Sequence, residues 1–358
     1  MKIKKILSFL LFPFSWIYGL IVFVRNKLFD LGLLRETRFN IPVISVGNIT
    51  VGGTGKTPHI EYLVSLLKND FKLAVLSRGY KRKTKGFILA DNYSDAGLIG
   101  DEPLQIKRKF PETEVAVDED RCNGIRNLLK SGKPIDIILL DDAFQHRYVK
   151  PGLSVLLVDY SRPVTKDYLL PYGRLREPAS GRYRADIVII SKSPATLQES
   201  DRQSIARDLK IADFQSLYFT TMVQNEIFPV FSSHQQEKIP AVNASSASIL
   251  LVSGIANPRE LKKFALNISP VIKEICYPDH HIFSKNDIAH IIHEFDALEG
   301  DEKILITTEK DAARLQKFSD LPENIKNKMF CLPVTVGFLN SDKEKFNTRI
   351  ITYVKKNK

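Results

Sequence analysis

The sequence is poor in cysteine, and this scarcity removes several classes of protein. It contains three cysteines in 358 residues, and Cys122, Cys276 and Cys331 stand far apart. An odd number of widely spaced cysteines has neither the pairing of a disulfide framework nor the close spacing of a metal or redox site. We therefore expect free thiols in a reducing compartment.

Other patterns are missing too. The chain has no internal repeat, no low-complexity tract and no recognisable nucleic-acid-binding module, so no nucleic-acid partner is expected. What is present describes a folded chain of one large or two domains, with 44% hydrophobic and 26% charged residues. Its net charge of +11 predicts an anionic partner, either a phosphorylated substrate or an anionic membrane surface.

The amino terminus carries an apolar run over residues 6–24, preceded by three lysines and followed by Arg25 and Lys27. No small-residue cleavage site follows, which argues against a secretory signal. The length would suit a transmembrane helix, but Pro13 and Trp16 lie within the run and basic residues flank both ends. We favour a helix that lies in, or dips into, one leaflet. A buried core helix is the alternative.

A glycine-rich stretch between an apolar run (41–46) and a helix-like run (58–68) has the layout of a phosphate-binding loop. Glycines let backbone N–H groups converge on a phosphate, and the helix that follows points its positive end at the same anion. Lys56 can reach the β- and γ-phosphates, and the Thr57 hydroxyl can hold Mg²⁺. Thr50 stands where the usual motif has its first Gly, and a plain Gly-rich turn is the alternative. The predicted nucleotide-binding residues are Thr50, Val51, Gly52, Gly53, Thr54, Gly55, Lys56 and Thr57.

Continuous apolar segments alternate with helix-like segments over much of the chain, which predicts an α/β fold with a doubly wound parallel sheet. Functional residues are then expected at the carboxyl ends of the strands. The expected strands of this part are 41–46, 72–77, 114–117, 135–140, 153–158 and 187–190. The predicted organisation is a membrane-associated helix (1–34), a phosphate-loop core (35–220), a hairpin connector (221–247) and a smaller α/β domain (248–358).

Candidate catalytic residues follow two of these segments. Asp141 and Asp142 end the strand over 135–140, where a Mg²⁺ ligand is usually found in such folds; a solvated turn is the alternative. A hydroxyl acceptor needs a positioned base. Asp101 is a candidate for that base, and it fits a helix N-cap equally well.

Two further groups are less specific. His280 and His281 could orient or charge such a base, although adjacent histidines are more often surface or capping residues. The arginine-rich segment around Arg176 suits bidentate phosphate contact, and Glu177 could reach a metal. A surface ion pair of little energetic value is the alternative there.

Taken together, these motifs resemble those of the tetraacyldisaccharide 4'-kinase family, the lipid A 4'-kinases of Gram-negative bacteria. The motifs occur in the family's order and span most of the chain, so the ordered set is more specific than any single motif. The matching stretches are Ser45-Val46-Gly47-Asn48 with the phosphate loop, Ser77-Arg78-Gly79-Tyr80, Gly100-Asp101-Glu102-Pro103, Asp120-Arg121, Asp141-Asp142-Ala143-Phe144-Gln145-His146, Leu175-Arg176-Glu177-Pro178, Asp279-His280-His281 and Thr308-Glu309-Lys310-Asp311.

The resemblance implies transfer of the ATP γ-phosphate to the 4'-hydroxyl of tetraacyldisaccharide 1-phosphate, giving lipid IVA, at the cytoplasmic face of the inner membrane. It implies that Lys56 and Thr57 hold phosphates and Mg²⁺, and that His280 assists Asp101 as the base. The acidic residues of the implied metal and phosphate site are Asp141, Asp142 and Glu177. The implied supporting residues are Arg78, Arg121, Gln145 and Arg176.

The sequence departs from the family pattern at two places. Ala143 stands where the family usually has Gly, and residues 165–168 replace a more usual Gly-Asn-Gly. Both departures concern local loop detail and leave the implied reaction unchanged.

Other functions stay open beside this one. A membrane-associated partitioning ATPase would carry Lys at the position of Val51. A regulatory GTPase would need N-K-x-D for guanine, which residues 191–194 and 309–311 match only in half. Both alternatives keep the phosphate loop and lose the lipid substrate.

Overall fold

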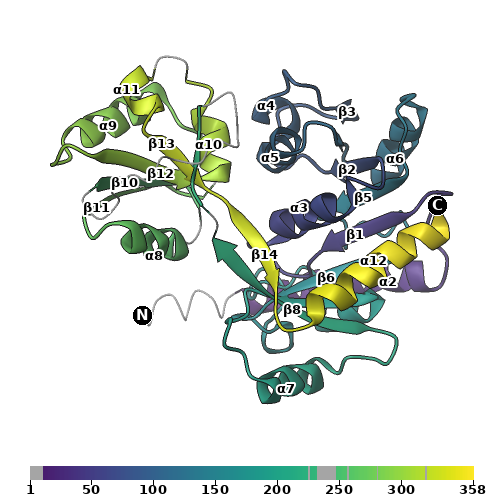
Figure 1. Ribbon diagram of the computed structural model, residues 1–358. Helices are drawn as coiled ribbons and strands as arrows, with labels where there is room; N and C mark the ends of the chain where they lie inside the picture. The colour runs from purple at the N-terminus through teal and green to yellow at the C-terminus, as the bar shows by residue number, and fades with distance from the viewer. Residues whose placement is uncertain (1–10, 225, 232–246, 256–257, 280, 319–320) are drawn as a thin grey trace. The chain divides into compact units, whose positions relative to one another are not determined.

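The computed structural model describes residues 11–224, 226–231, 247–255, 258–279, 281–318 and 321–358. The chain divides into a larger unit, Met1–Met222 with Val336–Lys358, and a smaller unit, Val223–Thr335 (Figure 1). The prediction that placed the whole of 248–358 in the smaller domain is therefore wrong for 336–358. Most of the predicted connector lies outside the described residues.

The larger unit is built on a mixed sheet, which has nine strands within the part of the chain that the structure describes. Pairing is parallel from β8 through to β4 and antiparallel between β4 and β3. The prediction of a parallel sheet is thus confirmed for its centre and not for this edge. The strand order is β14 (Val334–Phe338), β8 (Ser216–Gln224), β7 (Ile187–Ser191), β6 (Leu153–Asp159), β1 (Val43–Gly47), β5 (Ile137–Asp141), β2 (Leu73–Ser77), β4 (Glu114–Val117) and β3 (Ile88–Leu89).

The central strands are apolar at nearly every position because both faces of the sheet are covered. Every residue of β1, β5 and β7 is buried. In the register of β1 with β5, Val46 lies opposite Asp141. The end of β1, which leads into the phosphate loop, therefore lies beside the end of β5, which leads into the two aspartates.

Three helices of the larger unit contact strands of this sheet, namely α3 (Lys56–Leu67), α5 (Asp101–Lys109) and α6 (Arg121–Lys130). α3 contacts β1 and β5, whereas α6 contacts β2 and β4, and α5 contacts α3 and β4. The remaining short elements are α4 (Ala96–Ile99), η1 (Val164–Lys166), η2 (Ala179–Arg184) and α7 (Glu199–Leu209).

Helix α12 (Asp342–Asn357) explains why the carboxyl terminus belongs to the larger unit. Phe346, Ile350 and Val354 recur every four residues on one face and are buried. Phe346 lies against Tyr62 of α3 and Tyr218 of β8. The sequence shows that α12 is amphipathic but not which unit buries its apolar face.

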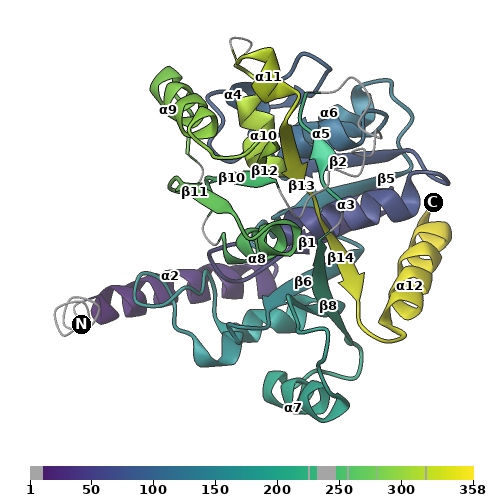
Figure 2. The same cartoon turned by 60° about the vertical axis from the view of Figure 1, so that its left-hand side comes forward.

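Helix α2 (Phe12–Asp30) forms the amino-terminal part of the described chain. Pro13 lies in its first turn, where proline is well tolerated. Figure 2 shows α2 in purple, with its amino-terminal end extending away from the strands of the nine-stranded sheet.

Within the described residues, no helix combines the length and the apolar character needed to cross a bilayer.

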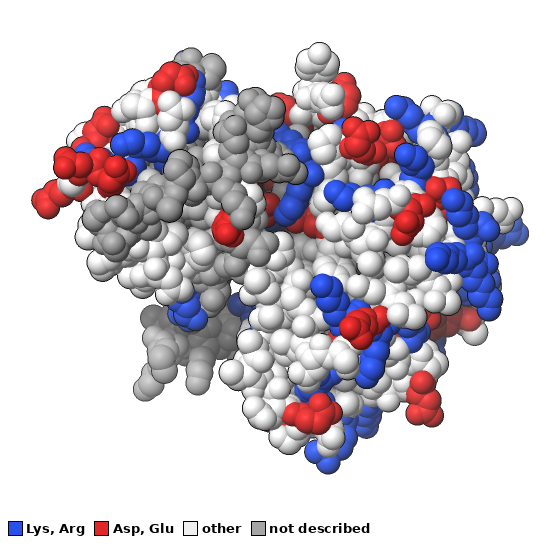
Figure 3. All heavy atoms as spheres, in the orientation of Figure 1, with Lys and Arg blue, Asp and Glu red and all other residues white. Residues whose placement is uncertain are grey.

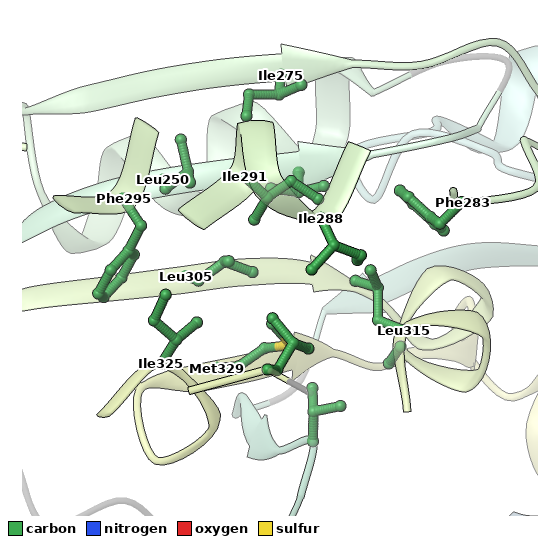
Figure 4. Close-up of a cluster of buried hydrophobic side chains, with 14 of the residues drawn as sticks. Leu250, Ile275, Phe283, Ile288, Ile291, Phe295, Leu305, Leu315, Ile325 and Met329 are labelled. Atoms are coloured by element: carbon green, nitrogen blue, oxygen red, sulfur yellow. The ribbon is translucent and has the colours of Figure 1, made fainter. Parts of the chain in front are cut away.

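The smaller unit has its own mostly parallel sheet and its own core. Its described strands lie in the order β11 (Ile272–Cys276), β10 (Ser248–Ser253), β12 (Lys303–Thr308), β13 (Met329–Leu332) and β9 (Phe228–Pro229). Its helices are α8 (Arg259–Ile268), α9 (Lys285–Asp296), α10 (Glu309–Leu315) and α11 (Glu323–Lys326). Figure 4 shows Ile288, Ile291 and Phe295 of α9 pointing towards Leu250 and Leu305 of the central strands.

Charges of both signs appear on the face drawn in Figure 3, with a run of Lys and Arg along its right-hand edge. The face drawn therefore carries basic and acidic side chains together.

The carboxylate of Asp342 gives a test of how α12 holds the larger unit. It is buried, pairs with Arg202 at 2.9 Å and accepts the Phe219 amide at 2.9 Å. Asp342→Ala would leave a largely buried guanidinium without its partner, so we expect a loss of about 3 kcal/mol in unfolding free energy. Urea unfolding measures it, and exposed Glu344→Ala is the control. Equal stability of both variants would contradict this role.

Candidate active site

The phosphate loop joins β1 to α3 and has the backbone that its glycines predict. Gly52 and Gly55 adopt φ angles of 110° and 84°, a region that favours glycine. Gly55 is the N-cap of α3. Inside the loop, Asn48 Nδ2 donates to Thr54 Oγ1 at 2.8 Å, and both residues are buried. The N–H groups at the start of α3 are thereby directed to the same place as the Lys56 side chain.

His59 and Ser191, which the sequence did not single out as site residues, form hydrogen bonds to the backbone of this loop. His59 Nδ1 lies 2.7 Å from the Gly55 carbonyl and Nε2 lies 3.1 Å from Thr220 Oγ1. A carbonyl only accepts, so Nδ1 carries the proton, and burial lowers the pKa of this histidine to about 4. Ser191 Oγ donates to the Thr54 carbonyl at 2.8 Å. Thr220 lies 161 residues from His59, and Thr54 lies 137 residues from Ser191, so no local motif signals these two contacts.

Lys192 is a further basic residue at the loop that the sequence analysis did not identify. Its Nζ pairs with Asp159 at 2.9 Å and also donates to the carbonyl of Gly53. Arg162 and Arg174 line a hollow beside the loop together with Asp159 and Asp167. The rim of the phosphate loop therefore carries basic and acidic side chains next to one another.

The arginine-rich segment is held against the start of the phosphate loop by backbone bonds. The Val51 amide donates to the Arg174 carbonyl at 2.8 Å, and the Arg176 amide donates to the Ile49 carbonyl at 2.8 Å. The predicted site residues Arg176 and Glu177 are therefore brought to the loop as expected.

Asp141, the last residue of β5, and Asp142, which follows it, have different surroundings. Asp142 adopts a left-handed φ of 48°. Its carboxylate pairs with Lys56 at 3.5 Å and with Arg176 at 3.1 Å. Burial acts to raise its pKa, but the two cations outweigh burial and the pKa is lowered. Asp142 thus orients the phosphate-loop lysine and the arginine.

Asp141 has no such partner. Its side chain is buried, and neither carboxyl oxygen has a hydrogen-bond partner among the described residues. Burial, followed by the charges of Glu102 and Asp142, raises its pKa to about 7. A buried carboxylate without a partner is costly, and a bound cation would relieve that cost. Asp141 therefore fits a Mg²⁺ ion beside the loop.

The other predicted metal ligands fit less uniformly. Thr57 is buried in the first turn of α3, which begins at Lys56, two residues before the predicted helix-like run, and its Mg²⁺ role stays a prediction. Glu177 pairs with Arg184 at 2.8 Å and accepts from Gln145 Nε2 at 2.8 Å. In the described part of the chain, no three His, Cys, Asp or Glu side chains gather as a metal centre. A nucleotide-bound Mg²⁺ needs only one or two protein ligands, because phosphates and waters supply the rest.

The predicted supporting residues lie around the same acids. Arg121 Nη1 donates to the Asp118 carbonyl at 2.8 Å and Nη2 to the Asp141 carbonyl at 3.4 Å. Burial lowers its pKa to about 10, and the positive charge of Arg78 acts in the same direction. Gln145 Nε2 donates to the Asn48 carbonyl at 2.7 Å. Arg121 and Gln145 therefore tie the end of β5 to its neighbours.

Asp101, the predicted base, is the first residue of α5, directly after the N-cap Gly100. The alternative in which Asp101 is itself the N-cap is therefore wrong. The next residue, Glu102, acts electrostatically on Asp141, and the sequence analysis did not foresee this. The start of α5 thus belongs to the acidic side of the site.

His280 lies outside the described residues, so its assistance to the base stays a prediction. The neighbouring His281 has a structural setting in the smaller unit. Its ring stacks on Tyr277 with centroids 4.5 Å apart, and Nε2 lies 3.0 Å from Asp287 Oδ2. This favours the capping and packing interpretation for His281.

The larger sheet and its glycine-rich loop define a protein of the phosphate-loop type. Residues 7–355 match the family described as LpxK: Tetraacyldisaccharide-1-P 4'-kinase. The chain belongs to this family.

Named relatives agree with this assignment. The tetraacyldisaccharide 4'-kinase of Phocaeicola vulgatus is 47% identical over 349 residues, which cover 97% of this chain and 95% of that protein. The one from Parabacteroides distasonis is 48% identical over 355 residues, covering 99% and 95%. A crystal structure of "apo" form LpxK from Aquifex aeolicus in complex with ATP superimposes with a TM-score of 0.74 at 29% identity, covering 97% of this chain and 99% of that chain.

The raised pKa of Asp141 predicts a pH-dependent cost in stability. Because that pKa rises from 3.8 to about 7 on folding, protonated Asp141 favours the folded state at low pH, and this advantage is lost as pH rises to about 7. Asp141→Asn should therefore raise the Tm of the ligand-free protein at about pH 8 by a few degrees, since about 1 kcal/mol shifts Tm by roughly 2–4 °C at this size. Calorimetry of wild type and Asp141→Asn at low pH and at about pH 8 measures this difference in Tm. A variant that is less stable than wild type at high pH would contradict the assignment.

Proposed function

We propose that the protein transfers the γ-phosphate of ATP to the 4'-hydroxyl of tetraacyldisaccharide 1-phosphate, an acylated disaccharide of lipid A biosynthesis, as its family name indicates. The observation that carries the proposal is the division of labour between Asp142 and Asp141. One aspartate holds the phosphate-loop lysine, and the other offers a buried, unpartnered carboxylate beside it. This arrangement suits the nucleotide side of a phosphoryl transfer.

The cations of the site stabilise the charge of the transferred group. Lys56 reaches the β- and γ-phosphates while Asp142 holds its ammonium group. Arg176, fixed by the same carboxylate, lies where its guanidinium can bind phosphate oxygens. Positioning and charge stabilisation account for most of the acceleration in reactions of this type.

A Mg²⁺ ion bound to ATP would be held by Thr57 and Asp141, and it would neutralise phosphate charge. Glu177 takes a supporting role in the proposal, because Arg184 and Gln145 already hold its carboxylate.

Asp101 acts as the base. The 4'-hydroxyl oxygen forms a bond to the γ-phosphorus, and its proton passes to the Asp101 carboxylate. The bond from the γ-phosphorus to the bridging oxygen breaks, and ADP leaves with that oxygen. The phosphorylated disaccharide and a protonated aspartate remain, and the aspartate then loses its proton to solvent.

We also propose that α2 seats the enzyme on the cytoplasmic face of the inner membrane. An acylated substrate leaves a bilayer only at about 0.8 kcal/mol per buried CH₂, so the enzyme must go to it. One side of α2 carries large apolar side chains that are each more than half exposed. An exposed apolar stripe of this kind favours an interfacial location. These residues are Phe14, Trp16, Ile17, Leu20, Ile21 and Phe23.

The direct test of the reaction uses the purified full chain, γ-labelled ATP with Mg²⁺, and the tetraacyldisaccharide 1-phosphate in detergent. We expect label to appear in the lipid. ATP turnover that never labels the lipid would favour a partitioning or regulatory ATPase instead.

A single substitution, Asp101→Ala, tests whether Asp101 is the general base. Asp101→Ala should lower kcat by about 10²-fold or more while ATP binding stays near wild type, because a general base contributes roughly 10²–10⁴-fold. Labelled-lipid assays and ATP titration measure the two quantities. Near-wild-type turnover would show that Asp101 serves only the start of α5.

If α2 binds the membrane surface, substitution of an exposed leucine on α2 should weaken vesicle binding more than the same substitution on α6. Leu20→Ser on α2 should weaken binding to anionic phospholipid vesicles about tenfold, the result of losing roughly 1.4 kcal/mol of apolar transfer energy. Leu129→Ser on α6 makes the same change at a leucine that is 46% exposed. Cosedimentation compares them, and equal binding of the two variants would contradict a seat on α2.

A further inference from the structure

Helix α2 has a polar side as well as its exposed apolar side. At 3.6 residues per turn, Ser15, Tyr18, Arg25, Asn26 and Phe29 fall within an arc of about 100°, so they share one side of the helix. Ser15 and Phe29 are buried. This side therefore packs against the body of the larger unit.

Ser15 and Phe29 anchor the two ends of this contact. Ser15 Oγ donates to the Leu169 carbonyl at 3.0 Å and accepts the Tyr172 amide at 2.9 Å. The Phe29 ring meets Tyr148 edge-on, with centroids 5.1 Å apart. The helix is thus fixed to the two loops that carry Arg176 with Glu177 and Gln145.

Three side chains between these anchors bond directly to the site residues of those loops. Tyr18 Oη donates to the Arg176 carbonyl at 2.7 Å. Arg25 Nη2 donates to the Gln145 carbonyl at 2.9 Å. Asn26 Nδ2 donates to Glu177 Oε2 at 3.4 Å.

From there, hydrogen bonds continue without a break to the phosphate loop. Glu177 Oε1 accepts from Gln145 Nε2 at 2.8 Å, and the same Nε2 donates to the Asn48 carbonyl at 2.7 Å. Asn48 in turn donates to Thr54 Oγ1 at 2.8 Å. The chain of contacts therefore runs from α2 to the centre of the loop.

Asn26 is poorly suited to a purely structural role. Its Oδ1 is buried and has no hydrogen-bond partner among the described residues. Such an atom costs stability, and an apolar side chain of similar shape would remove that cost. The hydrogen bond that Asn26 does make is the one from its Nδ2 to the Glu177 carboxylate, so this bond is the feature that distinguishes Asn26 from an apolar residue.

Tyr18 is likewise set up as a donor. Burial, followed by the charge of Glu177, raises the pKa of its hydroxyl, so the proton stays on the oxygen that bonds to the Arg176 carbonyl. The hydroxyl holds the backbone of the residue whose side chain pairs with Asp142.

We propose that Tyr18 and Asn26 are positioning residues, which hold Arg176 and Glu177 in the geometry that phosphoryl transfer needs. The apolar side of α2 then binds lipid, and its polar side positions the residues of the phosphate site. The catalytic part of this inference rests on the proposed kinase reaction, whereas the positioning part rests on the contacts alone.

Hydrogen exchange in the full chain tests the positioning without any substrate. In Tyr18→Phe and Asn26→Leu, the backbone amides of 174–177 should exchange about fivefold faster than in wild type, because the loop loses a tether. Tyr62→Phe is the matched control, since it removes a part-buried hydroxyl that donates to Asn347 at 2.8 Å in a different place. Unchanged exchange in both α2 variants would overturn the proposal.

The kinase assay tests the consequence. Tyr18→Phe and Asn26→Leu should each lower kcat about tenfold, with the KM for ATP within about twofold of wild type, since a small misplacement acts on the chemical step. Asn26→Leu should leave Tm unchanged or higher, and Asn26→Gln should recover part of kcat. A fall in kcat that follows a fall in Tm, or that Tyr62→Phe shares, would mean a structural role only. A wild-type chain that labels no lipid would refute the kinase reaction, while the exchange result still decides the positioning.

Discussion

The structure depends on two adjacent carboxyl groups at the end of one strand. Asp141 is the last residue of β5 and Asp142 follows it at the carboxyl edge of the sheet, where water cannot solvate them fully. Buried charge must be paired, coordinated or neutralised. Lys56 and Arg176 meet this requirement for Asp142, whereas the Asp141 carboxyl oxygens have no hydrogen-bond partner among the described residues and fit a bound cation.

Several features of the larger unit follow from this requirement. The register of β1 with β5 brings the phosphate loop to the aspartates. The backbone bonds between the loop and the segment 174–176 bring the arginine to the same point. α2 then holds that segment from the other side. The same helix exposes large apolar side chains to solvent, so one element carries both an apolar surface and contacts to the phosphate site.

Much of this could be predicted from the sequence, for identifiable reasons. Strands buried on both faces are apolar at successive positions, so β1, β5 and β7 were visible as continuous runs. The glycine-rich turn and Lys56 were visible because they form one continuous motif in the sequence. The membership of α12 in the larger unit was not visible, because an amphipathic pattern predicts a buried face without naming its partner. His59 and Lys192 escaped for a related reason, since their partners Thr220 and Gly53 lie 161 and 139 residues away. The four predicted metal ligands came from the phosphate-loop motif, the end of an apolar strand and the family resemblance, and only their surroundings in the structure separate Asp141 from Asp142 and Glu177.

The Mg²⁺ dependence of ATP affinity distinguishes the roles of the two aspartates. ATP binding would be measured by calorimetry with and without Mg²⁺ in wild type, Asp141→Asn and Asp142→Asn. We expect Mg²⁺ to strengthen ATP binding in wild type and in Asp142→Asn, and this strengthening to be lost in Asp141→Asn. Loss of the Mg²⁺ effect in Asp142→Asn, with its retention in Asp141→Asn, would mean that the two roles are assigned the wrong way round.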